Sequence, residues 1–351
     1  MTRPLRTAIL GCGHFARARH APHLSALQEI ELVAFCDDSR ESAEAFNQQF
    51  ASGRARIYTD YRRMFDELAL DLVYICLPPF AHGDEVPLAC EHGVHFLIEK
   101  PIALSLDLAW RMVEAVRKSG VKSQVGFMWR HGEAVRRVRH HLEQCPAGAL
   151  GFVSARYSCN ALHRPWWRDR SKSGGQLVEQ IIHLVDLTRF LLGEPVRVYS
   201  AQENLFHRHV EGYTVEDASG TVIRFASGSL AVLAATNGAI PGRWDSDVRV
   251  CLPGLTADLV DPNRGTFWDT ASTNPTPVPV EGEQDVYLAE TLDLLAAIRE
   301  DRPTAAPIEE GFRSLQLALA AARSAELDAP VDIPREDWRQ PGPSGHCQVG
   351  L

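Results

Sequence analysis

Short apolar runs alternate with helix-like stretches over the first 127 residues, and this alternation constrains the fold more than any other feature of the chain. The apolar runs lie at residues 7–10, 31–36, 56–58, 71–77, 94–98 and 122–127, and helix-like stretches separate them at 15–27, 40–50, 61–67, 82–91 and 106–119. A chain that repeats strand and helix in this way forms a parallel sheet with helices on both faces. The sequence therefore predicts an α/β N-terminal domain over residues 1–125.

The pattern changes after residue 126. A helix-like stretch at 133–143 is followed by strand-like segments at 152–158, 196–203, 221–225, 229–235, 248–252 and 257–260, and the turn Ala226-Ser227-Gly228 joins two of them as a hairpin. Amphipathic stretches follow at 286–299 and 309–327. This order predicts an α+β C-terminal domain over residues 126–335 with a large, mostly antiparallel sheet. Residues 336–351 are rich in Pro and Gly and hold too few apolar side chains to pack alone, so we expect an extended tail.

Composition excludes several functional classes. The 351 residues carry 36 Lys and Arg against 45 Asp and Glu, a formal net charge of −9. That balance argues against nucleic acid or an anionic membrane surface as the main partner. No apolar run reaches the ~18 residues of a membrane span, and residues 1–10 lack the features of a signal peptide. We therefore expect a cytoplasmic protein that neither binds nucleic acid nor enters a membrane.

The cysteines and histidines do not predict a metal site. The eight cysteines are scattered without a C-x-x-C pair, so we expect reduced, buried thiols. Cys90 is followed closely by His92 and His95. His140 adjoins His141, yet no three of these side chains have the usual zinc-ligand spacing.

The stretch Gly11-Cys12-Gly13-His14-Phe15-Ala16 stands between the first predicted strand and the first predicted helix. In this G-x-G-x-x-A pattern Gly11 allows a tight turn, Gly13 lets the backbone approach a pyrophosphate, and Ala16 permits close helix packing. Asp37 ends the second predicted strand, where an acidic side chain accepts a hydrogen bond from a ribose 2′-hydroxyl. The pattern predicts a Rossmann domain, and a structural glycine turn with a surface carboxylate is the alternative.

The residues after Asp37 bear on the choice of dinucleotide. Asp37 and Asp38 would repel the 2′-phosphate of NADP, so the sequence favours NAD. Ser39 and Arg40 are close enough to leave NADP as the alternative cofactor.

A second motif, Glu99-Lys100-Pro101, ends an apolar strand. Ligands of open parallel sheets bind beyond the carboxyl ends of the strands, so we expect Lys100 where the nicotinamide should lie. Pro101 restricts the backbone of Lys100 and would hold its ammonium group in place. An ordinary exposed lysine is the alternative.

A third motif follows Gly174-Gly175. On a regular helix Glu179, His183 and Asp186 fall on one narrow stripe of a largely apolar cylinder. Burying a carboxylate and an imidazole without partners costs several kcal/mol, so the stripe must face a partner, a cavity or a ligand. A structural Glu179–His183 pair would also explain it.

In this order and spacing, the three motifs and Leu77-Pro78-Pro79 resemble those of the Gfo/Idh/MocA oxidoreductases, the family of glucose-fructose oxidoreductase and inositol 2-dehydrogenase. The resemblance runs from about Thr7 to Ala325 and implies NAD(P)-dependent oxidation or reduction of a secondary hydroxyl or ketone of a sugar or cyclitol. It further implies a homo-oligomer, a dimer or tetramer, in which a sheet face is buried, and often a cis Lys100–Pro101 peptide bond.

The resemblance assigns roles to particular residues. Lys100 is the substrate-binding and catalytic lysine and His183 is the acid/base, while Glu179 is expected to orient His183 or a neighbouring hydroxyl. The residues expected to bind the cofactor are Gly11, Gly13, His14, Phe15, Ala16, Asp37, Asp38, Leu77, Pro78, Glu99, Lys100 and Arg168. Arg130, Trp166 and Trp167 are expected to join Lys100, Glu179 and His183 at the substrate. A surface salt bridge for Arg130 and a core position for the two tryptophans are the alternatives.

The chain also departs from the family pattern. Glu179 stands where many sugar dehydrogenases have Asp, and Gln180-Ile181 replaces the commoner small residues before His183. The expected reaction is hydride transfer between a carbinol carbon of a cyclic sugar, anhydrosugar or cyclitol and the nicotinamide. Basic residues in the loop before Gly174 leave room for a carboxylated or phosphorylated sugar. The two rival functions are a glycoside-processing enzyme that oxidises transiently and eliminates, and a non-catalytic NAD-sensing regulator.

Overall fold

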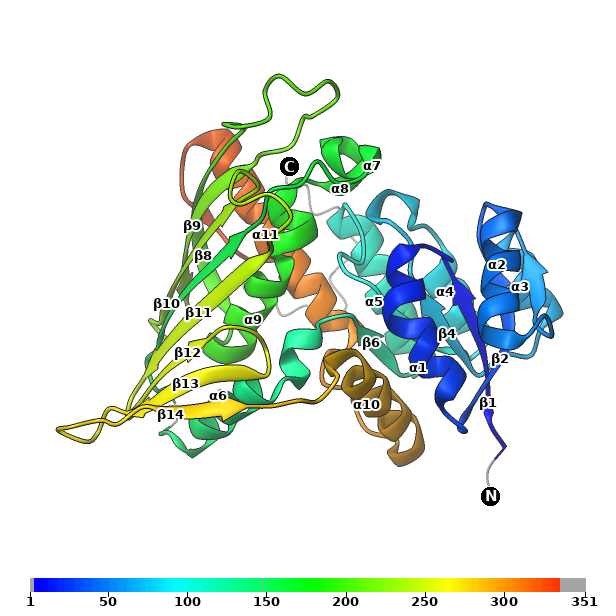
Figure 1. Ribbon diagram of the computed structural model, residues 1–351, viewed down its shortest axis with the longest axis horizontal. Coiled ribbons are helices and arrows are strands. Elements are labelled where there is room, and N and C mark those ends of the chain that lie inside the picture. The colour runs from blue at the N-terminus through cyan, green and yellow to red at the C-terminus, as the bar shows by residue number, and fades with distance from the viewer. Residues whose placement is uncertain (1–2, 147, 335–351) are drawn as a thin grey trace.

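The computed structural model describes residues 3–146 and 148–334, which form two domains lying side by side (Figure 1). The expected tail, residues 336–351, lies outside the described residues. The N-terminal domain is built on a parallel sheet and the C-terminal domain on a large, mostly antiparallel one. Both fold predictions are therefore confirmed.

The N-terminal sheet has six parallel strands in the order β3-β2-β1-β4-β5-β6. Its strands are β1 (Leu5–Leu10), β2 (Ile30–Cys36), β3 (Arg56–Tyr58), β4 (Leu72–Ile75), β5 (His95–Ile98) and β6 (Ser123–Val125). The helical segments are η1 (Ala16–His20, π-helical), α1 (Ala21–Ala26), α2 (Arg40–Ala51), α3 (Tyr61–Glu67), η2 (Pro79–Ala81), α4 (Glu85–Glu91) and α5 (Leu106–Ser119). The strand order reverses between β1 and β4, and this is where ligands bind in such sheets.

Local sequence explains where these helices begin. The side chains of Ser39, Asp60 and Ser105 each accept a hydrogen bond from a backbone N–H in the first turn of α2, α3 and α5. Such N-caps satisfy donors that have no partner within the helix. They fix the residue at which each of these helices begins.

The C-terminal sheet has nine strands in the order β14-β13-β12-β11-β7-β10-β9-β8-β15, and only the β7–β10 pair is parallel among the described pairs. The strands are β7 (Phe152–Ser158), β8 (Pro195–Glu203), β9 (Ala218–Phe225), β10 (Leu230–Thr236), β11 (Asp245–Leu252), β12 (Leu255–Leu259), β13 (Arg264–Asp269), β14 (Val278–Glu281) and β15 (Val331–Asp332). The last three strands were not predicted. The expected hairpin turn at residues 226–228 joins β9 to β10.

Helices cover one face of the nine-stranded sheet and leave the other open (Figure 1). The helical segments of this part are η3 (Met128–His131), α6 (Glu133–Gln144), α7 (Pro165–Arg168), α8 (Arg170–Ser173), η4 (Leu177–Ile181, π-helical), α9 (Ile182–Leu192), α10 (Val286–Glu300) and α11 (Ile308–Leu327). The open face carries exposed apolar side chains, among them Phe152, Tyr199, Val222, Leu230 and Val232.

The two C-terminal helices join the domains. Ile308 and Leu315 of α11 belong to the core beneath the parallel sheet, whereas Leu317 and Ala321 of the same helix belong to the core beneath the large sheet. Leu294 of α10 packs into the core on the other side of the parallel sheet. The last 50 described residues thus complete both domains.

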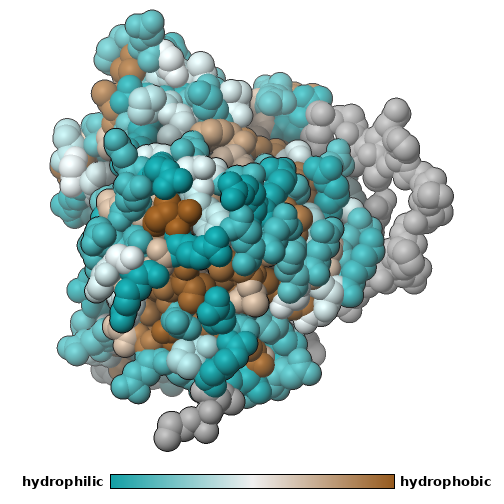
Figure 2. Space-filling view, turned by 90° about the vertical axis from the view of Figure 1, so that its right-hand side faces the viewer, coloured by the Kyte–Doolittle hydropathy of each residue, from teal (hydrophilic) through white to brown (hydrophobic). Residues whose placement is uncertain are grey.

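The surface at the Rossmann end is mostly hydrophilic, with hydrophobic residues gathered in its middle (Figure 2). Within the described ranges, no helix is long and apolar enough to span a membrane. The seven described cysteines are free thiols, although Cys76, Cys145 and Cys251 are only partly buried. Burial raises the pKa of Cys36 and Cys159 to about 12, so these two thiols stay protonated at neutral pH.

Candidate active site

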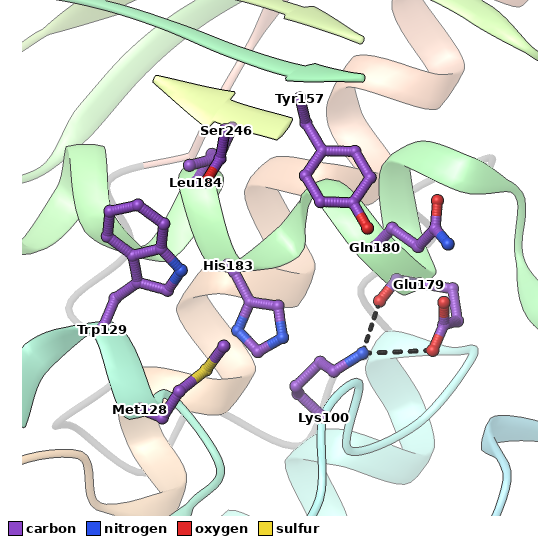
Figure 3. A pocket seen from close by; sticks show the side chains of 9 residues that line it. All are labelled: Lys100, Met128, Trp129, Tyr157, Glu179, Gln180, His183, Leu184 and Ser246. Carbon is purple, nitrogen blue, oxygen red and sulfur yellow. Dashed lines mark hydrogen bonds and ion pairs between the residues drawn. The ribbon is translucent and has the colours of Figure 1, made fainter. Parts of the chain in front are cut away.

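A pocket of about 280 Å³ opens between the end of β5, the η4–α9 helix and the covered face of the large sheet (Figure 3). Nine residues line it: Lys100, Met128, Trp129, Tyr157, Glu179, Gln180, His183, Leu184 and Ser246. The structure therefore brings together the three residues predicted to be catalytic, although they come from segments almost 80 residues apart.

Lys100 is held by two hydrogen bonds to a single residue. Its Nζ donates to the backbone carbonyl oxygen of Glu179 at 2.7 Å and to the carboxylate Oε1 at 3.1 Å (Figure 3). An ammonium group has three N–H donors, so one remains for a substrate oxygen. The Lys100–Pro101 peptide bond is cis.

His183 stands beside Lys100 in the pocket wall (Figure 3). Burial, and then the positive charge of Lys100, holds the pKa of His183 well below its usual 6.5. The ring is therefore neutral at pH 7 and able to accept a proton. Its Nδ1 is buried without a hydrogen-bond partner among the described residues, so Nε2 is the nitrogen open to the pocket.

Glu179 binds Lys100 and not His183. Besides the contact with Lys100, its Oε2 accepts a hydrogen bond from Trp167 Nε1 at 2.8 Å. Each carboxylate oxygen thus accepts a hydrogen bond from a fixed donor within the protein, and no hydrogen bond joins Glu179 to His183 in the described structure. The expected orientation of His183 by Glu179 does not occur, and Glu179 instead positions the ammonium group.

Asp186, the third member of the predicted stripe, lies outside the pocket. It forms two hydrogen bonds with the guanidinium group of Arg130, at 2.6 and 2.8 Å, and both side chains are buried. The π-helical turn η4 changes the spacing between Glu179 and His183, whereas His183 and Asp186 both lie on the regular helix α9. Arg130 also contacts Glu310 and the carbonyl oxygen of Ala305. Arg130 was expected to bind the substrate, but it forms a buried ion pair between helical segments and does not line the pocket.

The glycine-rich turn follows β1 at the point where the strand order reverses. Gly11 has a φ of +92°, and a Cβ there would lie 2.5 Å from the carbonyl oxygen of Cys76. A Cβ at Gly13 would meet no protein atom within 4 Å. Gly11 is thus required by the packing of β1 against the end of β4, whereas the space over Gly13 is open to a ligand.

Asp37 closes this turn from the end of β2. Its carboxylate accepts hydrogen bonds from the N–H groups of Cys12 and Ser39, at 2.7 and 2.9 Å. Burial raises the pKa of Asp37, against the opposite effect of these two N–H groups. Each oxygen keeps one lone pair, so the carboxylate can still accept a ribose hydroxyl.

The other predicted cofactor residues surround the same turn. His14, Phe15 and Asp38 are exposed beside it, Ala16 is buried, and Leu77 and Pro78 follow β4 next to Gly11. Glu99 is buried and contacts His20 Nε2 at 2.7 Å through Oε1, so it belongs to the supporting structure behind Lys100.

The loop before Gly174 contributes less to the pocket than expected. Arg168 donates to the carbonyl oxygens of Leu162 and His163 and does not line the pocket. Trp166 packs beside Phe80, with ring centroids 6.1 Å apart. Trp167 is buried in a cluster of its own and reaches the site only through Glu179.

Six pocket residues were not predicted to bind substrate: Met128, Trp129, Tyr157, Gln180, Leu184 and Ser246. Met128 and Trp129 stand beside Arg130 in the sequence, and Gln180 and Leu184 flank predicted site residues, so proximity to the motifs was a usable signal. Tyr157 and Ser246 lie on β7 and β11 and have no neighbouring motif. No group of three potential metal ligands is found in residues 3–146 and 148–334.

The parallel sheet with its glycine-rich turn and the pocket beside Lys100 are the features of a dinucleotide-dependent oxidoreductase. The family description "Oxidoreductase family, NAD-binding Rossmann fold" matches residues 5–127, and "GFO/IDH/MocA C-terminal domain" matches residues 135–254. The chain belongs to the Gfo/Idh/MocA family of oxidoreductases, as its motifs predicted.

Curated relatives span nearly the whole chain. D-glucoside 3-dehydrogenase of Escherichia coli K12 is 27% identical, over 94% of this chain and 98% of its own length. Myo-inositol 2-dehydrogenase of Thermotoga maritima is 24% identical, over 94% and 98%. The fold matches a solved structure of levoglucosan dehydrogenase in complex with NADH and levoglucosan, with a TM-score of 0.84, 19% identity and coverage of 95% and 100%.

Proposed function

We propose that this protein is an NAD-dependent dehydrogenase that oxidises a secondary hydroxyl of a cyclic sugar, anhydrosugar or cyclitol, or reduces the corresponding ketone. The observation that carries the proposal is the third N–H of Lys100, left free beside the neutral ring of His183. The names of the relatives, which act on a glucoside and on an inositol, support the substrate class.

The residues at the glycine-rich turn fit a dinucleotide. Gly13 leaves open space at a backbone that can approach a pyrophosphate, and Asp37 lies at the end of β2 with acceptor capacity for a ribose hydroxyl. When bound, the nicotinamide supplies the hydride acceptor or donor.

The pocket residues handle the substrate oxygen and its proton. Lys100 donates its free N–H to the oxygen and stabilises the negative charge that develops there. His183 accepts the hydroxyl proton at Nε2 as general base, or returns it in the reverse direction. Glu179 and Trp167 fix the position of the ammonium group, and Leu184 and Met128 are apolar residues of the same lining.

A screen of cyclic polyols, simple alcohols and 2-hydroxy acids with NAD, followed as NADH absorbance, tests the proposal. Ring polyols are expected to give the highest kcat/KM, because small substrates make too few hydrogen bonds to be oriented. Equal efficiency with lactate or ethanol would refute it. Product analysis should show a ketone at one ring carbon, and cleavage of a glycosidic bond would indicate the oxidation–elimination reaction.

For the cofactor, we propose NAD over NADP. Asp37→Asn removes a negative charge that repels a 2′-phosphate and keeps one of the two oxygens that accept from the N–H groups of Cys12 and Ser39. The variant is expected to lower the ratio of kcat/KM for NAD to that for NADP by about tenfold. A wild-type enzyme that already prefers NADP would contradict the assignment.

The neutral state of His183 predicts the acidic side of the pH profile. Oxidation requires the unprotonated ring, so activity is lost only as the pH falls through the lowered pKa of His183. The acid limb of kcat/KM should therefore lie below the ordinary pKa of 6.5, and it should disappear in His183→Gln. A limb centred above that value would exclude His183 as the base.

For the quaternary structure, we propose a homo-oligomer that buries the open face of the large sheet. Val222 and Val232, on adjacent strands, are 45% and 36% exposed there. Light scattering should show a dimer or tetramer, and Val222→Asp together with Val232→Asp should shift it to monomer. A monomeric wild type would contradict this.

The cytoplasmic location stays a prediction, which cell fractionation can test.

A further inference from the structure

Tyr157 and Ser246 form the wall of the pocket contributed by the large sheet (Figure 3). They are register partners in the β7–β11 pair. Their neighbours Arg156 and Asp247, also register partners, form an exposed ion pair. Because side chains alternate along a strand, Tyr157 and Ser246 lie on the covered face with the buried Ala155 and Val248.

Neither hydroxyl group of this wall is used by the fold. Within the described part of the chain, the phenol of Tyr157 and the hydroxyl of Ser246 form no hydrogen bond, although both residues line the pocket. Each hydroxyl can donate one hydrogen bond and accept others. They are therefore free to bind hydroxyl groups of a substrate that enters between them and Lys100.

The residues that line the pocket carry no net positive charge that could bind an anion. Lys100 is its only lysine or arginine, and the carboxylate of Glu179 lies 3.1 Å from the ammonium nitrogen. The last N–H of Lys100 is needed at the reacting oxygen. An additional anion in the pocket would therefore be desolvated without a cation of its own.

The basic residues nearby are occupied elsewhere. Arg130 is paired with Asp186, Arg170 donates to Glu216 at 2.8 Å, and Arg168 binds two backbone carbonyl groups. Arg164 and Lys172 are exposed and do not line the pocket.

We propose, on the basis of the dehydrogenase function above, that the pocket takes uncharged ring polyols and rejects their carboxylated and phosphorylated forms. In this arrangement Tyr157 and Ser246 bind ring hydroxyl groups away from the reacting carbon, and they set specificity without taking part in the chemistry. The basic loop before Gly174 does not provide an anion site.

The test compares matched substrates on the full-length enzyme with NAD. D-glucose, D-glucuronate and D-glucose 6-phosphate form one set, and myo-inositol and its monophosphate form another. In the set that is oxidised, kcat/KM of the neutral member should exceed that of the charged members by roughly 100-fold or more. Calorimetric titration of the same compounds into the enzyme with NADH should show the same order of affinity, independently of turnover.

Three variants assign the effect to the wall. Tyr157→Phe should raise KM for the neutral substrate by about fivefold or more and change kcat less. Ser246→Lys should reduce the preference for the neutral member by about tenfold or more, and Ser246→Ala is its control without a charge. The comparison of neutral and charged substrates uses the wild-type enzyme, so it does not depend on whether a variant folds.

The outcomes separate the two proposals. A charged member that is oxidised as well as its neutral partner overturns the charge selectivity and leaves the dehydrogenase function intact. No oxidation and no binding of any ring polyol overturns the dehydrogenase function itself. Unchanged kinetics in both Tyr157→Phe and Ser246→Ala removes these residues from substrate binding.

Discussion

Lys100→Met and His183→Gln are each expected to lower kcat/KM by roughly 100-fold or more. Lys100→Met removes the N–H of the ammonium group that is left for the substrate oxygen, and His183→Gln removes the group that accepts its proton. Neither residue belongs to the glycine-rich turn, so the dissociation constant for NAD should change little. Steady-state kinetics and NAD titration on the same preparations measure both quantities.

Trp167→Phe provides the matched control for the first prediction. It removes the hydrogen bond to Glu179 Oε2 but leaves the bonds between Glu179 and Lys100 available. Its effect on kcat/KM should be smaller than that of Lys100→Met, because it acts only through the position of the carboxylate. Near-normal turnover of Lys100→Met or His183→Gln would exclude the affected residue from the mechanism.

Gly11→Ala is expected to damage both the fold and the cofactor site. The new Cβ would lie 2.5 Å from the carbonyl oxygen of Cys76, at a φ of +92° that residues other than glycine avoid. The strained backbone alone costs about 1–3 kcal/mol, and the overlap forces the turn away from β4. We expect a lower Tm and NAD binding weakened by tenfold or more.

Gly13→Ala separates the two effects. A Cβ at Gly13 meets no protein atom within 4 Å, so thermal unfolding without NAD should match that of the wild type. Its NAD affinity should still fall, because the methyl group occupies space over a backbone that approaches the pyrophosphate. Unchanged NAD affinity in Gly13→Ala would place the pyrophosphate elsewhere.

The sequence predicted the features that depend on local pattern. The alternation of strands and helices gave the parallel sheet, and α3 and α5 have the predicted bounds of 61–67 and 106–119. Lys100 and His183 were found because each stands in a short motif with a fixed relation to a strand end or a helix. Strands β13, β14 and β15 were missed because β13 contains Gly and β14 contains Pro, which are rare in strands, and β15 has only two residues.

Features that depend on distant contacts could not be predicted in the same way. The spacing placed Asp186 on one stripe with Glu179 and His183 but could not show which of these side chains face the pocket, because the buried partner of Asp186, Arg130, lies 56 residues away in the sequence. Tyr157 and Ser246 become neighbours only when β7 and β11 pair, almost 90 residues apart in sequence. The binding of Lys100 by Glu179 likewise depends on the docking of two domains.

Helix α11 contributes side chains to both hydrophobic cores, and this has a consequence for cooperativity. Loss of the helix would remove Ile308 and Leu315 from the core beneath the parallel sheet. It would also remove Leu317 from the core beneath the large sheet. Neither half of the chain can then melt while the other stays intact, so unfolding should follow a single transition. A fragment that ends after β6 lacks the part of its core that α11 provides. Because α11 packs into both domains, it also restrains their rotation relative to each other.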